Sequence, residues 1–197
     1  MDLLADVQRN AVVPQWALVS SLVAPVAMIG GWSIAADRQP GGFDWVRRTI
    51  SELAGHGAHE RWIMTTGLAL LGICHLVTAA GLRTAATPGR VLLAIGGAAI
   101  IAVAALPLPA HGTSLWHGVA AGVVFVTLSA WPVASGVTAV NGLASAVLTG
   151  LLLLFLVELQ GGGAYAGATE RLLAGAQACC PAVVTLSASA RRQAAYS

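Results

Sequence analysis

Six apolar segments, separated by short connections, constrain the fold of this chain more than any other feature. Each is close to the length of about 20 residues that an α-helix needs to cross the hydrocarbon core of a bilayer. The segments span residues 16–36, 62–82, 91–109, 115–136, 140–159 and 170–190. Such segments span a membrane as helices because helices satisfy their own backbone hydrogen bonds. The pattern therefore predicts one all-α integral membrane domain over residues 1–197, a polytopic bundle of six transmembrane helices.

Composition agrees with a membrane location. Charged residues make up 9% of the chain, whereas a soluble domain carries about 25%. Tryptophans lie near the ends of the predicted spans, where membrane proteins have aromatic belts. They are Trp16, Trp32, Trp62, Trp116 and Trp131. The net charge of +2 is too small to indicate binding to nucleic acid, so we expect membrane lipids as partners and no nucleic acid.

Small residues in the spans predict close helix packing. Gly118 and Gly122 are four residues apart in the fourth segment, which is rich in glycine and alanine. Small residues at this spacing let two helix backbones approach each other. We therefore expect this face of the fourth helix to contact another helix of the same bundle.

The arginines indicate how the bundle lies in the membrane. Arg83 and Arg90 in the second connection, and Arg191 and Arg192 near the C-terminus, have no acidic neighbours. Basic residues in such short flanking segments favour the cytoplasm. We expect both termini in the cytoplasm, which places the first, third and fifth connections on the non-cytoplasmic side. These three connections carry most of the polar residues.

The most polar stretch of the chain is the first connection, FDWVRRTISELAGHGAHERW at 43–62. Val46, Ile50 and Leu53 recur in it at helical spacing. Such a stripe is typical of a short amphipathic helix that lies on a bundle or an interface. We expect a helix over residues 44–53, extending as a lid or rim to Gly55.

The opposite side of this expected helix is charged. Asp44, Arg48 and Glu52 follow one another four residues apart, a spacing that allows ion pairs on a helix surface. One interpretation is a solvated surface with exposed pairs, each contributing under about 1 kcal/mol. The other is a recognition site, favoured by the second arginine, Arg47, and by the polarity of this stretch in so apolar a chain.

The sequence FDWVRRTISELAGHGAHERWIMTTGL resembles the signature of the DUF998 family of bacterial and archaeal integral membrane proteins. That signature has an aromatic residue or Asp, a basic residue, Ile-Ser-Asp/Glu-Leu, a turn and an apolar span. The specific part is Asp44–Gly55, with looser similarity at His117 and at Glu170-Arg171. The resemblance implies six helices, a bacterial cytoplasmic membrane and distant similarity to the Frag1/DRAM/Sfk1 membrane proteins. It implies no activity.

The five histidines do not form a convincing metal or haem site. His56 and His59 lie in a Gly/Ala turn, and His111 and His117 are too far apart in register to share one helix face. A haem needs two histidines at matching depth between helices, but His75 lies far deeper than His117. We expect neither a metal nor another cofactor, although His75, as an intramembrane ionisable residue, is a candidate for function.

The candidate site residues all lie in connections on the non-cytoplasmic side or beside them. Carboxylates there are candidates for acid/base catalysis, and arginines, hydroxyl groups and a histidine for holding a head group. The catalytic candidates are Asp44, Glu52 and Glu158; the ligand-binding candidates are Arg47, Arg48, Ser51, His117, Glu170 and Arg171. Glu158 ends an apolar run, so we expect Arg48 to pair with it.

These candidates leave three hypotheses for function. The first is a pocket on the non-cytoplasmic side that binds an amphiphilic lipid or isoprenoid and, as an extension, modifies it by acid/base chemistry. The second is a structural or accessory protein without catalytic activity, which packs against another membrane protein or forms a homo-oligomer. The third and least favoured is a haem- or metal-binding membrane protein. The sequence does not decide whether the chain is an enzyme.

Cysteine-accessibility labelling tests the expected topology. A cysteine introduced at Ala86 or Ala195 should react only from the cytoplasmic side, and one at Gly57 or Gly163 only from the opposite side. Reversed accessibility would contradict the orientation but not the clustering of the polar connections.

Overall fold

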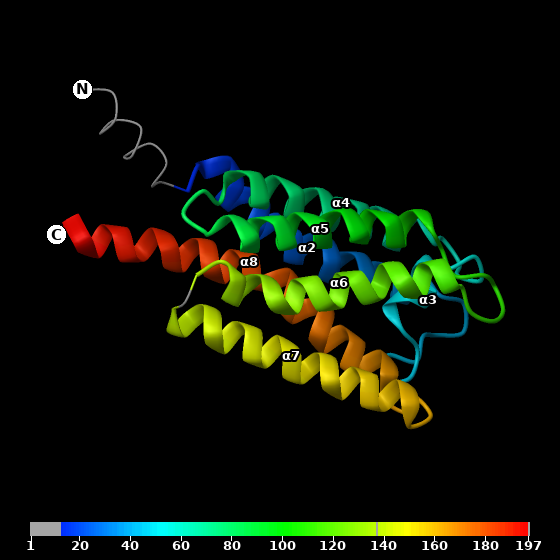
Figure 1. The fold of residues 1–197 in the computed structure, drawn as a ribbon. Coiled ribbons are helices and arrows are strands. Elements are labelled where there is room, and N and C mark those ends of the chain that lie inside the picture. Colours follow the sequence, from blue (N-terminus) through cyan, green and yellow to red (C-terminus); the bar gives the residue numbers. More distant parts are fainter. Residues whose placement is uncertain (1–12, 137, 197) are drawn as a thin grey trace.

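The computed structural model describes residues 13–136 and 138–196, with side chains as far as residue 190. The side chains of Arg191 and Arg192, which were used to predict the orientation, therefore lie outside the described part. The described residues form helices and connections (Figure 1). The helices are α2 (Gln15–Asp37), α3 (Ile50–Ala54), α4 (Trp62–Gly81), α5 (Thr87–Ala105), α6 (Leu115–Ala134), α7 (Ala139–Gln160) and α8 (Ala166–Tyr196).

Six of these helices, all except α3, are long and apolar enough to cross a membrane. The predicted all-α architecture is confirmed. Both ends of α5 differ from the expected ones by four residues. Helix α5 begins at Thr87, with Pro88 in its first turn, and ends at Ala105 before the Pro107 segment. Proline is favoured in a first turn and restricts the residue before it, so the two prolines account for both ends.

Helix α8 also begins earlier than expected, at Ala166. Gly162 and Gly163 precede it with φ angles of 99° and 74°, conformations that glycine adopts without steric cost. The chain therefore reverses within a few residues after α7. This early start places Glu170 and Arg171 in the second turn of α8.

The helices follow one another around the bundle. Helix α2 packs on α4 and α8, α4 on α5, α5 on α6, and α7 lies between α6 and α8 at the edge of the bundle (Figure 1). In α7, 22% of the apolar stretch is buried, against 39–50% in the other five spans. Helix α7 is thus the span with the least protein around it.

Glycines bring the backbones of α4 and α5 into contact. A Cβ built on Gly97 would lie 2.8 Å from the carbonyl oxygen of Gly72, so only hydrogen fits there. The predicted contact through Gly118 and Gly122 is wrong, because a Cβ at either position would meet no atom within 4 Å. The spacing of small residues was present, but this face of α6 borders open space.

The predicted helix over residues 44–53 is shorter in the structure. Only Ile50–Ala54 is helical; residues 45–48 form a turn, and Val46 is 43% exposed whereas Ile50 is buried. The Asp44 carboxylate accepts hydrogen bonds from the backbone N–H groups of Val46 and Arg47, at 3.0 and 3.1 Å. Such local bonds compete with helix formation, which removes Val46 from the expected apolar stripe.

The polar connections gather at one end of the bundle, away from the end where α8 terminates (Figure 1). The backbone N–H of His56, in the first connection, donates to the carbonyl oxygen of Leu108, in the third, at 2.8 Å. Arg171 at the start of α8 bonds to the first connection as well. The expected clustering of these connections is therefore present in the structure.

Replacing Gly97 with alanine should destabilise the protein. The added methyl group would push α4 and α5 apart, and overpacking of this kind costs about 1–3 kcal/mol. The matched control is Gly118→Ala, which adds the same group on α6 into open space. Thermal unfolding in detergent should show a lower midpoint for Gly97→Ala only. Equal midpoints for the two variants would contradict the close α4–α5 contact.

Candidate functional site

The first turns of α8 hold the first connection in place through backbone hydrogen bonds. The N–H of Ala168 donates to the carbonyl oxygen of Val46 at 3.0 Å. The guanidinium of Arg171 donates through Nη1 to the carbonyl oxygens of Trp45 and Arg48, at 3.0 and 2.8 Å. Irregular backbone beside a membrane needs such partners because unsatisfied carbonyls are costly there.

Glycine and aromatic contacts tighten the same junction. A Cβ on Gly167 would overlap the carbonyl oxygen of Arg48, so the connection touches the α8 backbone directly. The Arg171 guanidinium lies 5.0 Å from the ring centre of Trp45 and 5.4 Å from that of Phe43, and Arg48 lies 4.6 Å from Phe43. Each cation–π contact of this kind contributes about 0.5–1 kcal/mol where it is exposed.

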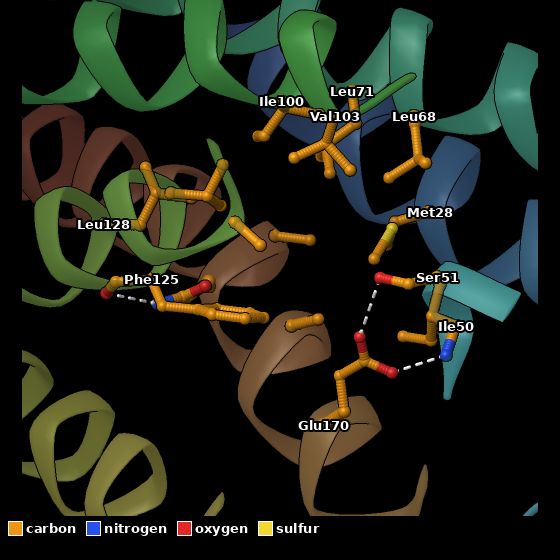
Figure 2. A pocket seen from close by; sticks show the side chains of 15 residues that line it. Met28, Ile50, Ser51, Leu68, Leu71, Ile100, Val103, Phe125, Leu128 and Glu170 are labelled. Atoms are coloured by element: carbon orange, nitrogen blue, oxygen red, sulfur yellow. Dashed lines mark hydrogen bonds between the residues drawn. The ribbon is translucent and has the colours of Figure 1, made fainter. Parts of the chain in front are cut away.

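Glu170 is the buried carboxylate of this end of the bundle. It accepts hydrogen bonds from the backbone N–H of Ile50 and from the Ser51 hydroxyl, the latter at 3.3 Å, and is 4% exposed (Figure 2). The first N–H groups of a helix have no partner within the helix, and a negative charge is favourable beside them. Glu170 therefore caps α3 from another segment.

A capping box completes the start of α3. The Thr49 hydroxyl accepts a hydrogen bond from the N–H of Glu52, and the Glu52 carboxylate accepts one from the N–H of Thr49 at 2.9 Å. The other oxygen of Glu52 pairs with Arg48 Nε at 2.9 Å. Both side chains of this pair are about 40% exposed, so the pair contributes under about 1 kcal/mol.

The expected pairing of Arg48 with Glu158 is wrong. Arg48 binds Glu52 in its own segment, and Glu158 Oε2 accepts a hydrogen bond from the backbone N–H of Tyr165 at 3.1 Å. Glu158 lies at the end of α7, where a backbone donor of the next turn reaches it. It is thus partnered locally and needs no arginine from elsewhere.

The structure separates the remaining candidates. Asp44 and Arg47 are exposed on the turn before α3. The backbone N–H groups of Arg47 and Val46, with the nearby arginine charges, hold the pKa of Asp44 below its ordinary value. These two residues and Glu158 stay outside the cavities described next, whereas Ser51, His117 and Glu170 come together.

A groove of about 250 Å³ runs between α6 and α7 at this end of the bundle. Its walls are apolar or lack side chains, and its inner end is polar. Gly118, Gly122, Phe155, Leu156 and Leu159 belong to the walls; Thr49, Ser51, His117 and Glu170 supply the polar end. The open space beside Gly118 and Gly122 is this groove.

A smaller cavity of about 40 Å³ adjoins the groove, and Figure 2 shows the side chains that line it. Ser51, Ala121, Phe125 and Glu170 line both spaces, so Glu170 stands between the groove and the interior. A volume of about 40 Å³ holds roughly three water molecules at 10–15 Å³ each. Gln177 lines the cavity and donates to the carbonyl oxygen of Phe125 at 3.0 Å.

His117 is fixed at the polar end of the groove by two hydrogen bonds. Its backbone N–H donates to the Ser114 hydroxyl that caps α6, and Nδ1 lies 2.8 Å from the carbonyl oxygen of Leu106. The side chain is 5% exposed. Its Nε2 is buried and has no hydrogen-bond partner among the residues that the structure describes. Buried polar atoms of this kind are uncommon in proteins and require an explanation.

A second, polar pocket of about 220 Å³ lies on the surface beside the groove. It is lined by Arg48, Glu52 and the backbone of the first and third connections, and Leu108 lines both this pocket and the groove. The Arg48–Glu52 pair is therefore a rim feature outside the groove.

The other histidines lie apart from the groove. His56 contacts Arg61 at 3.3 Å, His111 is exposed, and His75 is fully buried in α4 and lines neither cavity. Within residues 13–136 and 138–190, no three metal-binding side chains come together.

Sequence analysis missed Gln177 and Thr49 as parts of the site; a polar residue within an apolar span was the available signal for Gln177.

The fold and this site define a six-helix integral membrane protein with a polar-ended groove at one end of the bundle. The chain belongs to the family described as "Protein of unknown function (DUF998)", whose sequence model matches residues 21–187. The match covers four spans completely, most of the first and sixth spans, and the first connection, which confirms the resemblance to this family. No curated protein and no solved structure matches the chain.

Replacing Glu170 should separate its role as a hydrogen-bond acceptor from its charge. Glu170→Ala leaves the Ile50 N–H and the Ser51 hydroxyl without their acceptor, at a cost of about 1–3 kcal/mol. Glu170→Gln keeps an oxygen acceptor and should retain most of the stability. Thermal unfolding in detergent measures both, with Glu158→Ala as the carboxylate control on a locally bonded position. An unchanged midpoint for Glu170→Ala would contradict the capping role.

Proposed function

We propose that this protein binds an amphiphilic lipid or isoprenoid from the surrounding membrane in the groove between α6 and α7. The observation that carries the proposal is the groove itself, which combines apolar walls with a polar end at Ser51 and at the buried side chains of His117 and Glu170. Apolar walls with a few placed polar groups are characteristic of small-molecule sites. The polar end would hold the head group and the walls would hold the tail.

The size of the groove limits what it takes. Ligand pockets commonly have volumes of about 300–1,000 Å³, and this groove has about 250 Å³. It suits a head group with part of one chain, while the rest of the chain stays among the membrane lipids. The arginine pattern favours the non-cytoplasmic side for this end of the bundle, and in that orientation the ligand would enter from that leaflet.

Acid/base chemistry on the bound molecule would fall to Glu170 and His117. Glu170 and His117 both line the groove and are buried, and Nε2 of His117 has no hydrogen-bond partner among the described residues. The carboxylates first considered for catalysis have other places: Asp44 and Glu158 accept backbone hydrogen bonds, and Glu52 belongs to the rim pocket. Catalysis is thus an extension of the binding proposal.

A structural or accessory role is the alternative, and the low burial of α7 favours it. In that case a helix of another membrane protein, or of a second copy, would cover α7 and fill the groove. The two proposals differ in what occupies the space beside Gly118 and Gly122.

Filling the groove from α6 tests the proposal. Gly122→Leu and Gly118→Leu place a side chain in the groove, where a Cβ meets no other atom. Gly150→Leu is the matched control, because it adds the same side chain in open space on α7 away from the groove. Native mass spectrometry of protein purified with its lipids should show one bound amphiphile in the wild type and in Gly150→Leu.

The two groove variants should lose this bound mass, and all variants should keep a thermal midpoint near that of the wild type. An amphiphile that persists unchanged in Gly118→Leu and Gly122→Leu would contradict binding in the groove. A stoichiometric protein partner, or a dimer that these variants dissociate, would support the accessory role instead.

A further inference from the structure

We infer that the amphiphile of the groove carries a phosphate, which lies beside Arg48 in the rim pocket. This inference rests on the proposed function and adds the class of head group. The two spaces adjoin one another, because Leu108 lines both. The apolar part of the ligand then lies in the groove, and its head group runs past Leu108 into the rim pocket. Neither of the buried side chains His117 and Glu170 lines that pocket.

The sizes of the two spaces favour one ligand that occupies both. The groove has a volume of about 250 Å³ and the rim pocket of about 220 Å³. Each is below the range of about 300–1,000 Å³ that is common for ligand sites, and together they fall within it. The walls of the groove are apolar, whereas a charged pair and backbone line the rim pocket. This order of surfaces matches a tail followed by a polar head group.

Arg48 presents two oriented donors at the rim pocket. Its Nε donates to Glu52 Oε2 at 2.9 Å, and its guanidinium lies 4.6 Å from the ring centre of Phe43. These two contacts orient the planar group. Its terminal nitrogens, Nη1 and Nη2, have no hydrogen-bond partner among the residues that the structure describes. The side chain is 42% exposed, so a ligand can reach them.

A phosphate matches these donors better than a hydroxyl group does. A guanidinium binds two oxygens of a phosphate at once, through parallel hydrogen bonds that the opposite charges strengthen. A hydroxyl group offers a single oxygen and no charge. A cationic head group would face the free nitrogens of Arg48, and like charges repel.

The backbone around the rim pocket supplies further donors. Gly57, Ala110 and Gly112 line the pocket, and their N–H groups have no hydrogen-bond partner in the described part of the chain. A fatty-acid carboxylate would use both of its oxygens on Arg48. A phosphate monoester keeps a further oxygen for these backbone donors, which favours phosphate over carboxylate.

Glu52 is the other charged residue that lines the rim pocket, and both of its oxygens are engaged. Oε1 accepts hydrogen bonds from the N–H and the hydroxyl of Thr49, and Oε2 accepts the one from Arg48. The charges of the two side chains offset each other. The preference for phosphate therefore comes from the directed hydrogen bonds of Arg48 and the backbone rather than from net charge.

Paired photoreactive probes test the head group. Protein in dodecyl maltoside micelles, which contain no phosphate, is labelled with a diazirine-bearing hexadecyl phosphate and with the alcohol of the same chain. Peptide mass spectrometry maps the labels, which should lie along α6 and α7 at the groove and should saturate. Half-maximal labelling by the alcohol should need at least about tenfold more probe, as expected for the loss of one charge-assisted hydrogen bond.

Arg48→Gln tests the proposed contact. Glutamine lacks the guanidinium, so the phosphate should lose its advantage, while labelling by the alcohol stays near that of the wild type. Arg48→Lys keeps the charge without the paired donors and should retain only part of the advantage. Arg47→Gln is the matched control, because this neighbouring arginine is exposed on the same turn and lines neither space. The ratio of the two probes is measured within each variant, so a loss of stability alone does not imitate the result.

Competition distinguishes a lipid phosphate from free phosphate. Unlabelled hexadecyl phosphate should displace the phosphate probe. Inorganic phosphate at the same concentration should not displace it, because it lacks the tail that fills the groove. Equal displacement by the two competitors would overturn a lipid as the source of the phosphate.

The outcomes separate this inference from the proposed function. Groove labelling by the alcohol equal to or stronger than that by the phosphate would overturn the phosphate assignment and leave lipid binding standing. An unchanged preference for phosphate in folded Arg48→Gln would overturn the contact with Arg48. Should Arg48→Gln fail to fold, a full advantage in Arg48→Lys would overturn the paired donors. Absence of any saturable label along α6 and α7 from either probe would overturn both the inference and the proposed function.

Discussion

The polar end of this bundle depends on the carboxylate of Glu170 at the start of α3. The first connection brings irregular backbone to the edge of the membrane, where unpaired N–H and C=O groups are costly. Glu170 accepts the N–H of Ile50, and the adjacent Arg171 donates to the carbonyl oxygens of Trp45 and Arg48. One dipeptide thus satisfies both kinds of backbone group and joins two segments about 120 residues apart.

This interaction gives the Ile-Ser-Glu-Leu stretch of the first connection a structural role. Ile50 and Leu53 are buried, Ser51 bonds to Glu170, and Glu52 closes the capping box. Most of the charged residues that the sequence offered as ligand-binding candidates therefore form hydrogen bonds that hold the first connection in place. Among the described residues, the atoms at this end without a hydrogen-bond partner include His117 Nε2, contributed by another helix, and Nε and Nη2 of Arg171. The site is defined by the groove that this loop closes at one end.

The sequence predicted the six spans because each apolar segment is long enough to cross a membrane. It also grouped Glu170 and Arg171 with the first connection, because successive spans run in opposite directions and alternate connections share one side. It could not predict that the helix begins only at Ile50. The helical spacing of Val46 and Ile50 does not show that the Asp44 carboxylate accepts hydrogen bonds from backbone N–H groups. Nor could it exclude the pairing of Arg48 with Glu158, because a sequence gives no depth or rotation for a helix end. The glycines show the same limit: Gly97 and Gly118 look alike in sequence, yet one meets a backbone and the other open space.

That difference between glycines explains why the groove lies beside α7. Glycines draw α4 and α5 into backbone contact, whereas α7 is held to α6 by side chains. Ser145 accepts a hydrogen bond from the N–H of Val133 at 3.0 Å, and the rings of Phe125 and Phe155 meet edge to face at 5.4 Å. Phe125 lines both the groove and the internal cavity. Both rings line the groove that also contains Glu170, so the groove lies where helices meet through side chains, away from the backbone contact of α4 with α5.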